Sequence, residues 1–166
     1  MWSKGITLAM CLVLSICIPS YAQDTTAVEP FEVLEISGTI SVDDKGLEEA
    51  FVELYEDNEV VDAFETKKNG KFKFSLYNDL IYTIQITKKG FYTKRISVNT
   101  TLPKDYDDFS KFQFDIGLTS KEEADYDPYL AEYPSALIAF DKKKKEFNYD
   151  KKYTKSYFDE VDVSAE

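Results

Sequence analysis

Between residues 34 and 118, short runs of alternating apolar and polar residues are separated by turn residues. In the first run, Leu34, Ile36, Gly38, Ile40 and Val42 alternate with Glu35, Ser37, Thr39 and Ser41. An alternation with a period of two places one set of side chains on the core face of a strand and the other in water. Six further runs lie at 50–55, 60–65, 71–76, 82–87, 92–98 and 111–118. Seven short strands without a helical period predict an all-β, seven-stranded antiparallel β-sandwich.

The alternation also predicts which side chains form the core. The residues predicted to be buried are Phe72, Phe74, Tyr82, Ile84, Ile86, Phe112 and Phe114. Turns are expected at 43–46, 57–58, 68–70 and 88–90, where aspartate, asparagine, lysine and glycine interrupt the runs. Asn69-Gly70 is a strong hairpin signal, because both residues accept the positive φ of a type I′ turn.

The last part of the chain, 119–166, is a tail in which a β-hairpin is predicted over 136–149. Ala136, Ile138 and Phe140 alternate in its first strand, and the turn follows at 141–145. Three forms remain open for this segment: an extension of the sandwich edge, an independent partner-binding arm, or a disordered segment. The residues from about Tyr157 onward are expected to be frayed.

The first 22 residues are typical of a signal peptide, with Lys4, an apolar run over 6–18 and a small-x-small ending at Ala22. The apolar run is shorter than the roughly 20 residues of a spanning helix, so no transmembrane segment is expected in the mature chain. Both cysteines, Cys11 and Cys17, fall within this peptide. Residues 23–33 are interpreted as an acidic linker, and the sandwich as 34–118. The protein is therefore predicted to be exported, with periplasmic, outer-membrane-associated and extracellular locations open.

The same runs resemble the carboxypeptidase regulatory-like domain, a transthyretin-like or Ig-like sandwich module of exported bacterial proteins. The resemblance covers about residues 34–100 and is carried by 36–40 (ISGTI), 50–54 (AFVEL), 69–72 (NGKF), 82–84 (YTI) and 90–91 (GF). One position departs from the pattern, because Leu80 stands where the family usually has glycine. The resemblance implies a structural or binding module without catalytic residues.

Composition removes most catalytic chemistry. The chain has no histidine, and no cysteine follows residue 22, which excludes Ser-His-Asp and Cys-His nucleophile systems and imidazole or thiolate metal sites. No catalytic, cofactor-binding or metal-binding residue is therefore predicted. Two acidic groups, Asp105/Asp107/Asp108 and Glu122/Glu123/Asp125/Asp127, offer oxygen ligands for calcium, but neither has the spacing and mid-loop glycine of a calcium loop. They are interpreted as solvated loops.

Charge is arranged in blocks along a chain of net charge −11. Residues 24–66 hold 14 acids and one lysine, residues 67–104 hold nine bases and one acid, and residues 105–141 hold ten acids and two lysines. Either the blocks form cross-strand ion pairs, with strands two and three facing strands four to six, or they create a bipolar docking surface. The net charge disfavours nucleic acid as a partner.

Three functions remain open. The preferred hypothesis is a non-catalytic cell-envelope module that binds a protein partner through sheet edges and loops. The alternative is a carbohydrate-binding module of the starch-binding type, in which Tyr55, Tyr77, Phe91 and Tyr92 would supply the aromatic platform. A small-ligand carrier, as in transthyretin, is the third hypothesis, and no feature of the sequence supports a cavity for it.

Overall fold

The computed structural model describes residues 30–106, 108–122 and 128–164. The elements are β1 (Glu32–Val42), β2 (Lys45–Gly46), β3 (Phe51–Glu56), β4 (Glu59–Glu65), β5 (Lys71–Tyr77), β6 (Ile81–Thr87), β7 (Lys94–Asn99), β8 (Ser110–Gly117), the 3-10 helix η1 (Pro128–Glu132), β9 (Ala136–Asp141), β10 (Glu146–Tyr149) and α1 (Lys151–Ser164). The predicted signal peptide and most of the predicted linker lie outside the described residues. β1 begins at Glu32, inside the segment predicted as linker.

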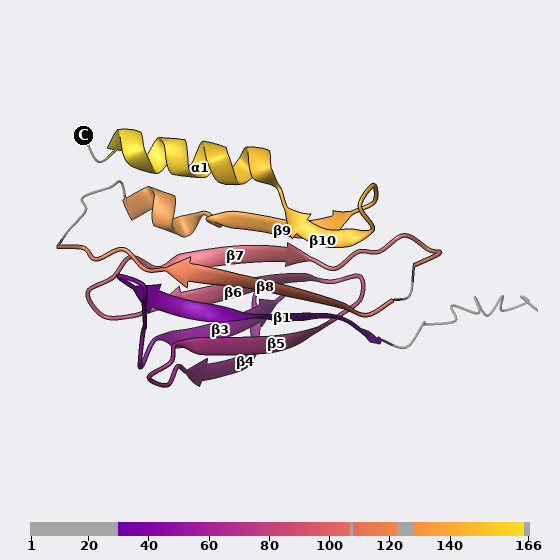
Figure 1. Cartoon of the computed structure of the whole chain (residues 1–166), viewed down its shortest axis with the longest axis horizontal. Coiled ribbons are helices and arrows are strands. Elements are labelled where there is room, and N and C mark those ends of the chain that lie inside the picture. The colour runs from indigo at the N-terminus through magenta and orange to yellow at the C-terminus, as the bar shows by residue number, and fades with distance from the viewer. Residues whose placement is uncertain (1–29, 107, 123–127, 165–166) are drawn as a thin grey trace, which may run out of the picture.

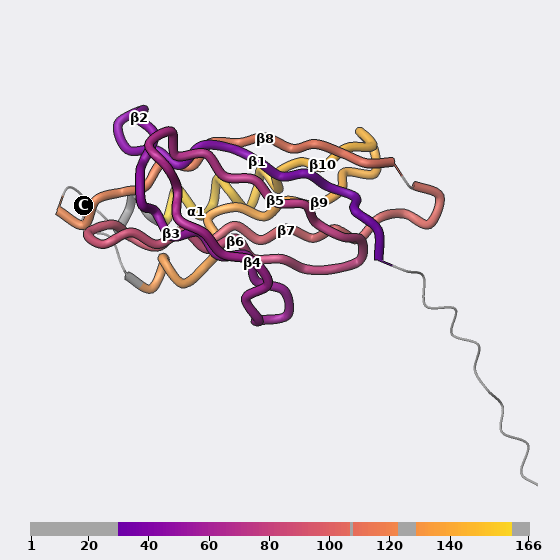
Figure 2. Tube along the Cα trace, turned by 90° about the horizontal axis from the view of Figure 1, so that it is seen from below, coloured from indigo at the N-terminus to yellow at the C-terminus, as the bar shows by residue number. Residues whose placement is uncertain are grey.

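The strands form two sheets that pack face to face, which confirms the predicted all-β sandwich (Figure 1). In the first sheet, β1 lies between β5 and β8, and β2 pairs with the end of β1. The second sheet has the order β10-β9-β7-β6-β3-β4. The view turned by 90° places β1 and β8 in one layer and β6 and β7 in the other (Figure 2).

Two strand pairs are parallel, although an antiparallel sandwich was expected. β8 runs parallel to β1, and β9 runs parallel to β7. In each pair a long stretch of chain separates the two strands, because parallel strands cannot be joined by a two-residue turn. The C-terminal hairpin of β9 and β10 therefore adds two strands to the edge of the second sheet.

The core lies between the sheets and is formed by the alternating apolar residues. Six of the seven residues expected there are buried: Phe72, Phe74, Tyr82, Ile84, Ile86 and Phe114. The prediction is wrong for Phe112, which is half-buried. β8 is an edge strand, and Phe112 packs there against the ring of Tyr149, with the ring centroids 5.2 Å apart.

Two of the predicted turns join neighbouring strands with paired positive-φ residues. Asp43 and Asp44 have φ of 49° and 60°, and Asp57 and Asn58 have φ of 46° and 68°. The predicted hairpin at Asn69-Gly70 is wrong, because the strands on its two sides, β4 and β5, belong to different sheets. Of this pair only Gly70 has positive φ, and its N–H donates to the carbonyl of Lys67 at 2.8 Å. The turn therefore carries the chain from one sheet to the other.

The last described element is a helix, α1, and it includes residues 157–164, which were expected to be frayed. Asp150 caps it, since its Oδ1 accepts hydrogen bonds from the backbone N–H groups of Lys152 and Tyr153, both at 3.0 Å. Tyr153 donates to the carbonyl of Pro134 at 2.7 Å, and the buried Tyr157 donates to that of Leu130 at 3.2 Å. These contacts hold the helix against η1 and β9 and stabilise it through tertiary packing, as is usual for helices of this length.

Candidate functional site

β4 is an exposed edge strand of the second sheet. Its only strand neighbour among the described residues is β3, so one row of its backbone N–H and C=O groups has no strand partner. None of its residues is buried, and Val60 and Val61 are 49% and 52% exposed. Exposed edges of this kind are sites where another chain can pair.

A bulge shapes the β4 edge. Leu54 pairs with Asp62, whereas the next residue of β3, Tyr55, pairs with Val60. Val61 is thus an extra residue in β4, and such an insertion bends the strand and increases its twist. The bulge brings Val61 to the mouth of a groove between the edges of the two sheets.

This groove, which we call the edge groove, lies between β4 and β5 and has a volume of about 240 Å³. Buried apolar groups line its inner part, and Val61 and Tyr77 lie at its exposed part. Its lining consists of Leu54, Glu56, Val61, Asp62, Phe74, Ser75, Tyr77 and Tyr82. The hydroxyl of Tyr82 accepts a hydrogen bond from the backbone N–H of Tyr77 at 3.2 Å, and burial raises the pKa of Tyr82. The groove is large enough for one apolar side chain.

β4 and the turn before it are acidic. Glu56, Asp57, Glu59, Asp62 and Glu65 carry negative charge, and no lysine or arginine occurs between residues 56 and 65. Within the part of the chain that the structure describes, none of these five carboxylates has a cation within ion-pair distance. Their charge is therefore directed at solvent or at a partner.

Other charges of the blocks form ion pairs within the chain. Glu35 of β1 lies 2.6 Å from Lys73 of β5 and 3.4 Å from Lys111 of β8, and Glu49 lies 3.3 Å from Lys88. The contacts of Glu35 with Lys73 and Lys111 hold the pKa of Glu35 below its usual range. The pairing of Glu35 connects β1 with β5 and β8, which the predicted charge pairing did not include. The Glu49–Lys88 pair joins the segment before β3 to the segment after β6, and β3 and β6 are the second and fifth predicted strands.

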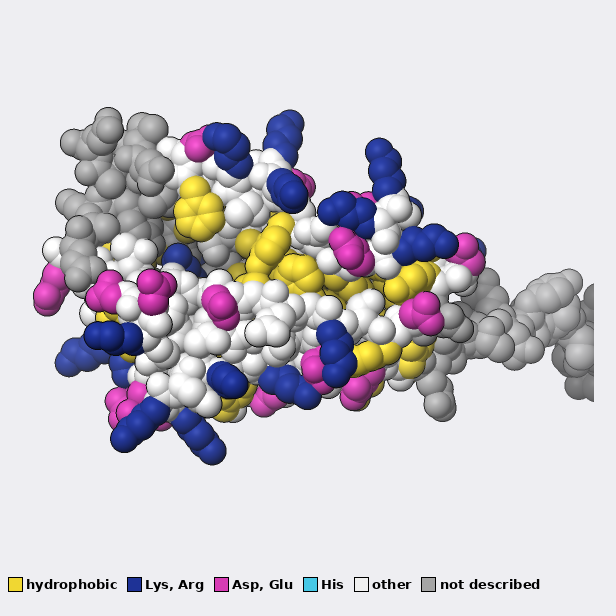
Figure 3. Space-filling view, viewed as in Figure 1, with side chains coloured by type: hydrophobic (Ala, Val, Ile, Leu, Met, Phe, Trp, Pro, Cys, Tyr) yellow, Lys and Arg dark blue, Asp and Glu magenta, His cyan; other side chains and the backbone are white. Residues whose placement is uncertain are grey.

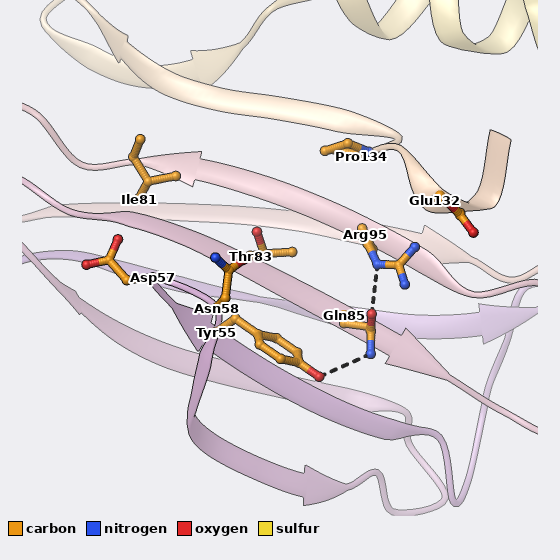
Figure 4. Close-up of a pocket in the computed structure, with 9 residues that line it drawn as sticks. All are labelled: Tyr55, Asp57, Asn58, Ile81, Thr83, Gln85, Arg95, Glu132 and Pro134. Carbon is orange, nitrogen blue, oxygen red and sulfur yellow. Dashed lines mark hydrogen bonds between the residues drawn. The ribbon is translucent and has the colours of Figure 1, made fainter. Parts of the chain in front are cut away.

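A polar depression, which we call the outer-face pocket, lies on the solvent side of the second sheet (Figure 4). Its floor comes from neighbouring positions of three strands: Tyr55 pairs with Thr83, and Gln85 pairs with Arg95. The β3–β4 turn forms one wall, and the end of η1 together with the residues that follow it forms the other. The lining residues are Tyr55, Asp57, Asn58, Ile81, Thr83, Gln85, Arg95, Glu132 and Pro134, around a volume of about 510 Å³.

A chain of hydrogen bonds fixes the polar groups of this pocket. Arg95 donates from Nε to Oε1 of Gln85 at 2.7 Å and from Nη1 to the carbonyl of Ala131 at 2.6 Å. Gln85 in turn donates from Nε2 to Glu53 at 3.0 Å and to the hydroxyl of Tyr55 at 3.4 Å. Burial, followed by the charge of Glu53, raises the pKa of Tyr55. The guanidinium is held in one orientation while facing the pocket.

The face seen in Figure 3 carries both signs of charge around a central band of apolar side chains. Where β8 adjoins β10, the rings of Phe112 and Phe114 contact Tyr149, with centroids 5.2 and 6.1 Å apart. These aromatic contacts join the two sheets, and we assign them to packing.

The four aromatic residues considered from sequence as a sugar platform do not come together. Tyr92 is buried, the half-buried Phe91 packs against the core, Tyr77 lies at the edge groove, and only Tyr55 lines the outer-face pocket. Of the acidic groups, Asp107, Glu123, Asp125 and Asp127 lie outside the described residues. Among the residues that are described, no group of three or more acidic, histidine or cysteine side chains is arranged to hold a metal.

Arg95 is the functional candidate that sequence reasoning missed. It is the one arginine among 20 basic residues, and a lone arginine in a lysine-rich chain is a usable signal. Arginine presents a rigid planar set of donors that lysine cannot reproduce. Its neighbours in the pocket, however, are distant in sequence and require the strand register.

Comparison with known proteins gives no family. No family model matches the chain, and no curated protein sequence matches it. In the described part of the chain, no helix has the length and apolar character needed to span a membrane.

Similar solved structures include 3-chlorocatechol 1,2-dioxygenase from Rhodococcus opacus, with 9% identity over 54% of this chain and 60% of that one, at a TM-score of 0.37. S. CueP is 15% identical over 57% of this chain and 65% of that one, at a TM-score of 0.35. Catechol 1,2-dioxygenase from Acinetobacter is 16% identical over 58% of this chain and 55% of that one, at a TM-score of 0.37. The chain spans less than two thirds of each of these proteins, and similarity at this level carries no conclusion about function.

Proposed function

We propose that this protein is a non-catalytic module of the cell envelope that binds an extended segment of a partner protein along β4. The observation that carries the proposal is the exposed edge of β4 next to the edge groove. A peptide added to a sheet edge gains backbone hydrogen bonds, while a pocket for one of its side chains gives specificity. β4 supplies the first and the edge groove supplies the second.

The charge of β4 indicates the chemistry of the partner segment. Glu59, Asp62 and Glu65 lie on β4 without ion-pair partners in the described part of the chain. Opposite charges on facing strands stabilise a pair, and like charges destabilise it. A second copy of β4 would bring acids next to acids, so self-pairing is disfavoured. The favoured segment alternates apolar residues with lysine or arginine.

Absence of catalysis and location in the envelope are parts of the same proposal. Composition supports the first, because a chain without histidine lacks the commonest general base at neutral pH. The signal-peptide pattern of residues 1–22 supports the second. The resemblance of residues 34–100 to the carboxypeptidase regulatory-like domain agrees with a binding role. N-terminal sequencing of the exported protein tests the location, with Gln23 as the expected first residue.

The binding proposal is tested with synthetic peptides and the full chain. The probe is an eight-residue peptide of alternating lysine and valine, compared with one of alternating glutamate and valine. We expect the basic peptide to shift the NMR signals of β4 amides and to bind more weakly as salt rises, because exposed charges are screened. The acidic peptide should not bind.

Two charge-reversal variants locate the contact. Asp62→Lys changes β4, whereas Glu48→Lys makes the same change at an exposed residue outside it. We expect Asp62→Lys to abolish binding of the basic peptide and Glu48→Lys to leave it largely unchanged. Equal binding by both variants, or peptide-induced shifts confined to other strands, would show that β4 is not the docking edge.

A further inference from the structure

We infer that the outer-face pocket binds a neutral carbohydrate. This inference is independent of strand addition at β4, since the pocket faces solvent from the middle of the second sheet rather than from its edge. Its volume of about 510 Å³ falls within the ~300–1,000 Å³ range of small-molecule sites.

The pocket offers both kinds of hydrogen-bonding group that a sugar hydroxyl requires. Arg95 has five N–H donors, of which the fold uses one on Nε and one on Nη1. The remaining donors are available to a ligand. Asp57 and Glu132 supply carboxylate acceptors, and Thr83 supplies a hydroxyl. Each sugar hydroxyl both donates and accepts hydrogen bonds, so a ligand with several hydroxyls can use these donors and acceptors together.

Charge selects a neutral ligand. The lining carries two carboxylates, Asp57 and Glu132, and one guanidinium, Arg95, so its net negative charge disfavours an anion, while the guanidinium opposes the close approach of a cation. Neither carboxylate forms an ion pair with Arg95, so the opposite charges do not cancel at short range. Hydroxyl groups interact favourably with both, and hydrogen bonds to charged groups are stronger than those between neutral groups.

The pocket is also preorganised. The hydrogen bonds from Arg95 to Gln85 and Ala131, and from Gln85 to Glu53, fix the donor plane before a ligand arrives. The half-buried ring of Tyr55 adds an apolar surface beside these polar groups. Groups that are already fixed lose little conformational entropy on binding. Figure 4 shows Arg95 and Asp57 at separate ends of the pocket, as an elongated ligand requires.

The first experiment applies the labelled full chain to an array of neutral and uronic-acid oligosaccharides. Free amino acids and the basic lysine–valine peptide are titrated separately against the same preparation, with the pocket signals monitored by NMR. We expect binding to neutral glycans that is nearly independent of salt. The inference is overturned if no neutral glycan binds at millimolar concentration. It is also overturned if the pocket binds only acidic glycans, amino acids or the peptide.

The second experiment assigns the site with isothermal titration of the strongest neutral glycan. Arg95→Lys keeps the charge and removes the planar donors, and Asp57→Asn keeps the shape of the turn, because asparagine accepts its φ of 46°. We expect each change to weaken binding by about tenfold, the loss of one charge-assisted hydrogen bond. Asp57→Asn keeps the test decisive if Arg95→Lys impairs folding.

Asp62→Lys is the matched control, because it removes the proposed peptide contact at β4 and lies outside the lining of the outer-face pocket. It should leave glycan affinity unchanged, while Arg95→Lys should leave binding of the lysine–valine peptide at β4 unchanged. Glycan binding that survives both pocket substitutions overturns the assignment. Because the two sites have separate variants, failure of one proposal is distinguishable from failure of the other.

Discussion

The rings of Phe64 and Phe74 lie 5.5 Å apart, one on β4 and the other on β5, and so connect the two sheets beside the edge groove. Phe74 is buried, and Phe64 is half-buried. This contact supports the edge strand from inside while its outer edge stays exposed. The position of β4 is therefore set by the core.

Phe74→Ala should lower the free energy of unfolding by about 3–5 kcal/mol, because a cavity adds to the lost transfer energy. Denaturant unfolding followed by far-UV circular dichroism measures the change. Phe109→Ala is the control, since Phe109 is 47% exposed and its removal should cost less than about 1 kcal/mol. Similar losses for the two variants would contradict the position of Phe74 in the core.

Gly38→Ala should be strongly destabilising, because a Cβ at residue 38 would lie 1.6 Å from the carbonyl oxygen of Phe114. The β1–β8 pair cannot accommodate this atom without moving the backbone, and overpacking typically costs about 1–3 kcal/mol or more. Gly117→Ala is the matched control on β8, where a Cβ meets nothing within 4 Å. Thermal melts of both variants provide the comparison, and equal melting temperatures would refute the close approach.

The stabilising effect of Glu35 should depend on pH. The contacts with Lys73 and Lys111 lower its folded-state pKa, so its contribution is present above the unfolded-state pKa of about 4.3 and is lost as pH falls through the folded value. Glu35→Gln should thus be less stable than the wild type near neutral pH and approach it in acid. Urea unfolding across this pH range tests the trend. A difference that is constant with pH would exclude the ion pairs as its cause.

Asp150→Ala should remove the cap of α1 and lower stability by about 1 kcal/mol. Asp150→Ser retains a capping oxygen and should lose much less. Hydrogen exchange of amides in α1 measures the effect locally, with faster exchange expected in the alanine variant. Unchanged exchange would mean that Tyr153 and Tyr157 hold the helix without the cap.

The alternation of side chains predicted the core well because period-two burial is a local property of each strand. Phe72 and Phe74, or Ile84 and Ile86, needed no knowledge of their neighbours. The partner of β5 was not predictable in this way, because Asn69-Gly70 has the residues of a hairpin turn but serves a connection between sheets. Local turn chemistry does not decide which strand pairs with which.

The helix and the pocket show two other limits. Tyr153 and Tyr157 are one helical turn apart after the capping Asp150, a signal present in the sequence but outweighed by threonine, valine and aromatic residues. The outer-face pocket joins Tyr55, Arg95 and Glu132 from three distant segments. The register of β3, β6 and β7 brings Tyr55 near Arg95, and the hydrogen bond from Arg95 to the carbonyl of Ala131 holds η1 beside them. Both relationships are tertiary properties.

The pairing of β1 with β8 affects how the chain acquires its fold. β1 includes residue 34 and β8 includes residue 110, and these two residues are paired partners in the first sheet. Contacts between positions so far apart form slowly, because a long loop must close before they contribute stability. During synthesis from the N-terminus, one side of β1 would stay unpaired until β8 has been made. Unpaired strands are prone to aggregation. Until residue 117 is available, β1 therefore presents an unpaired edge at which misassembly can begin.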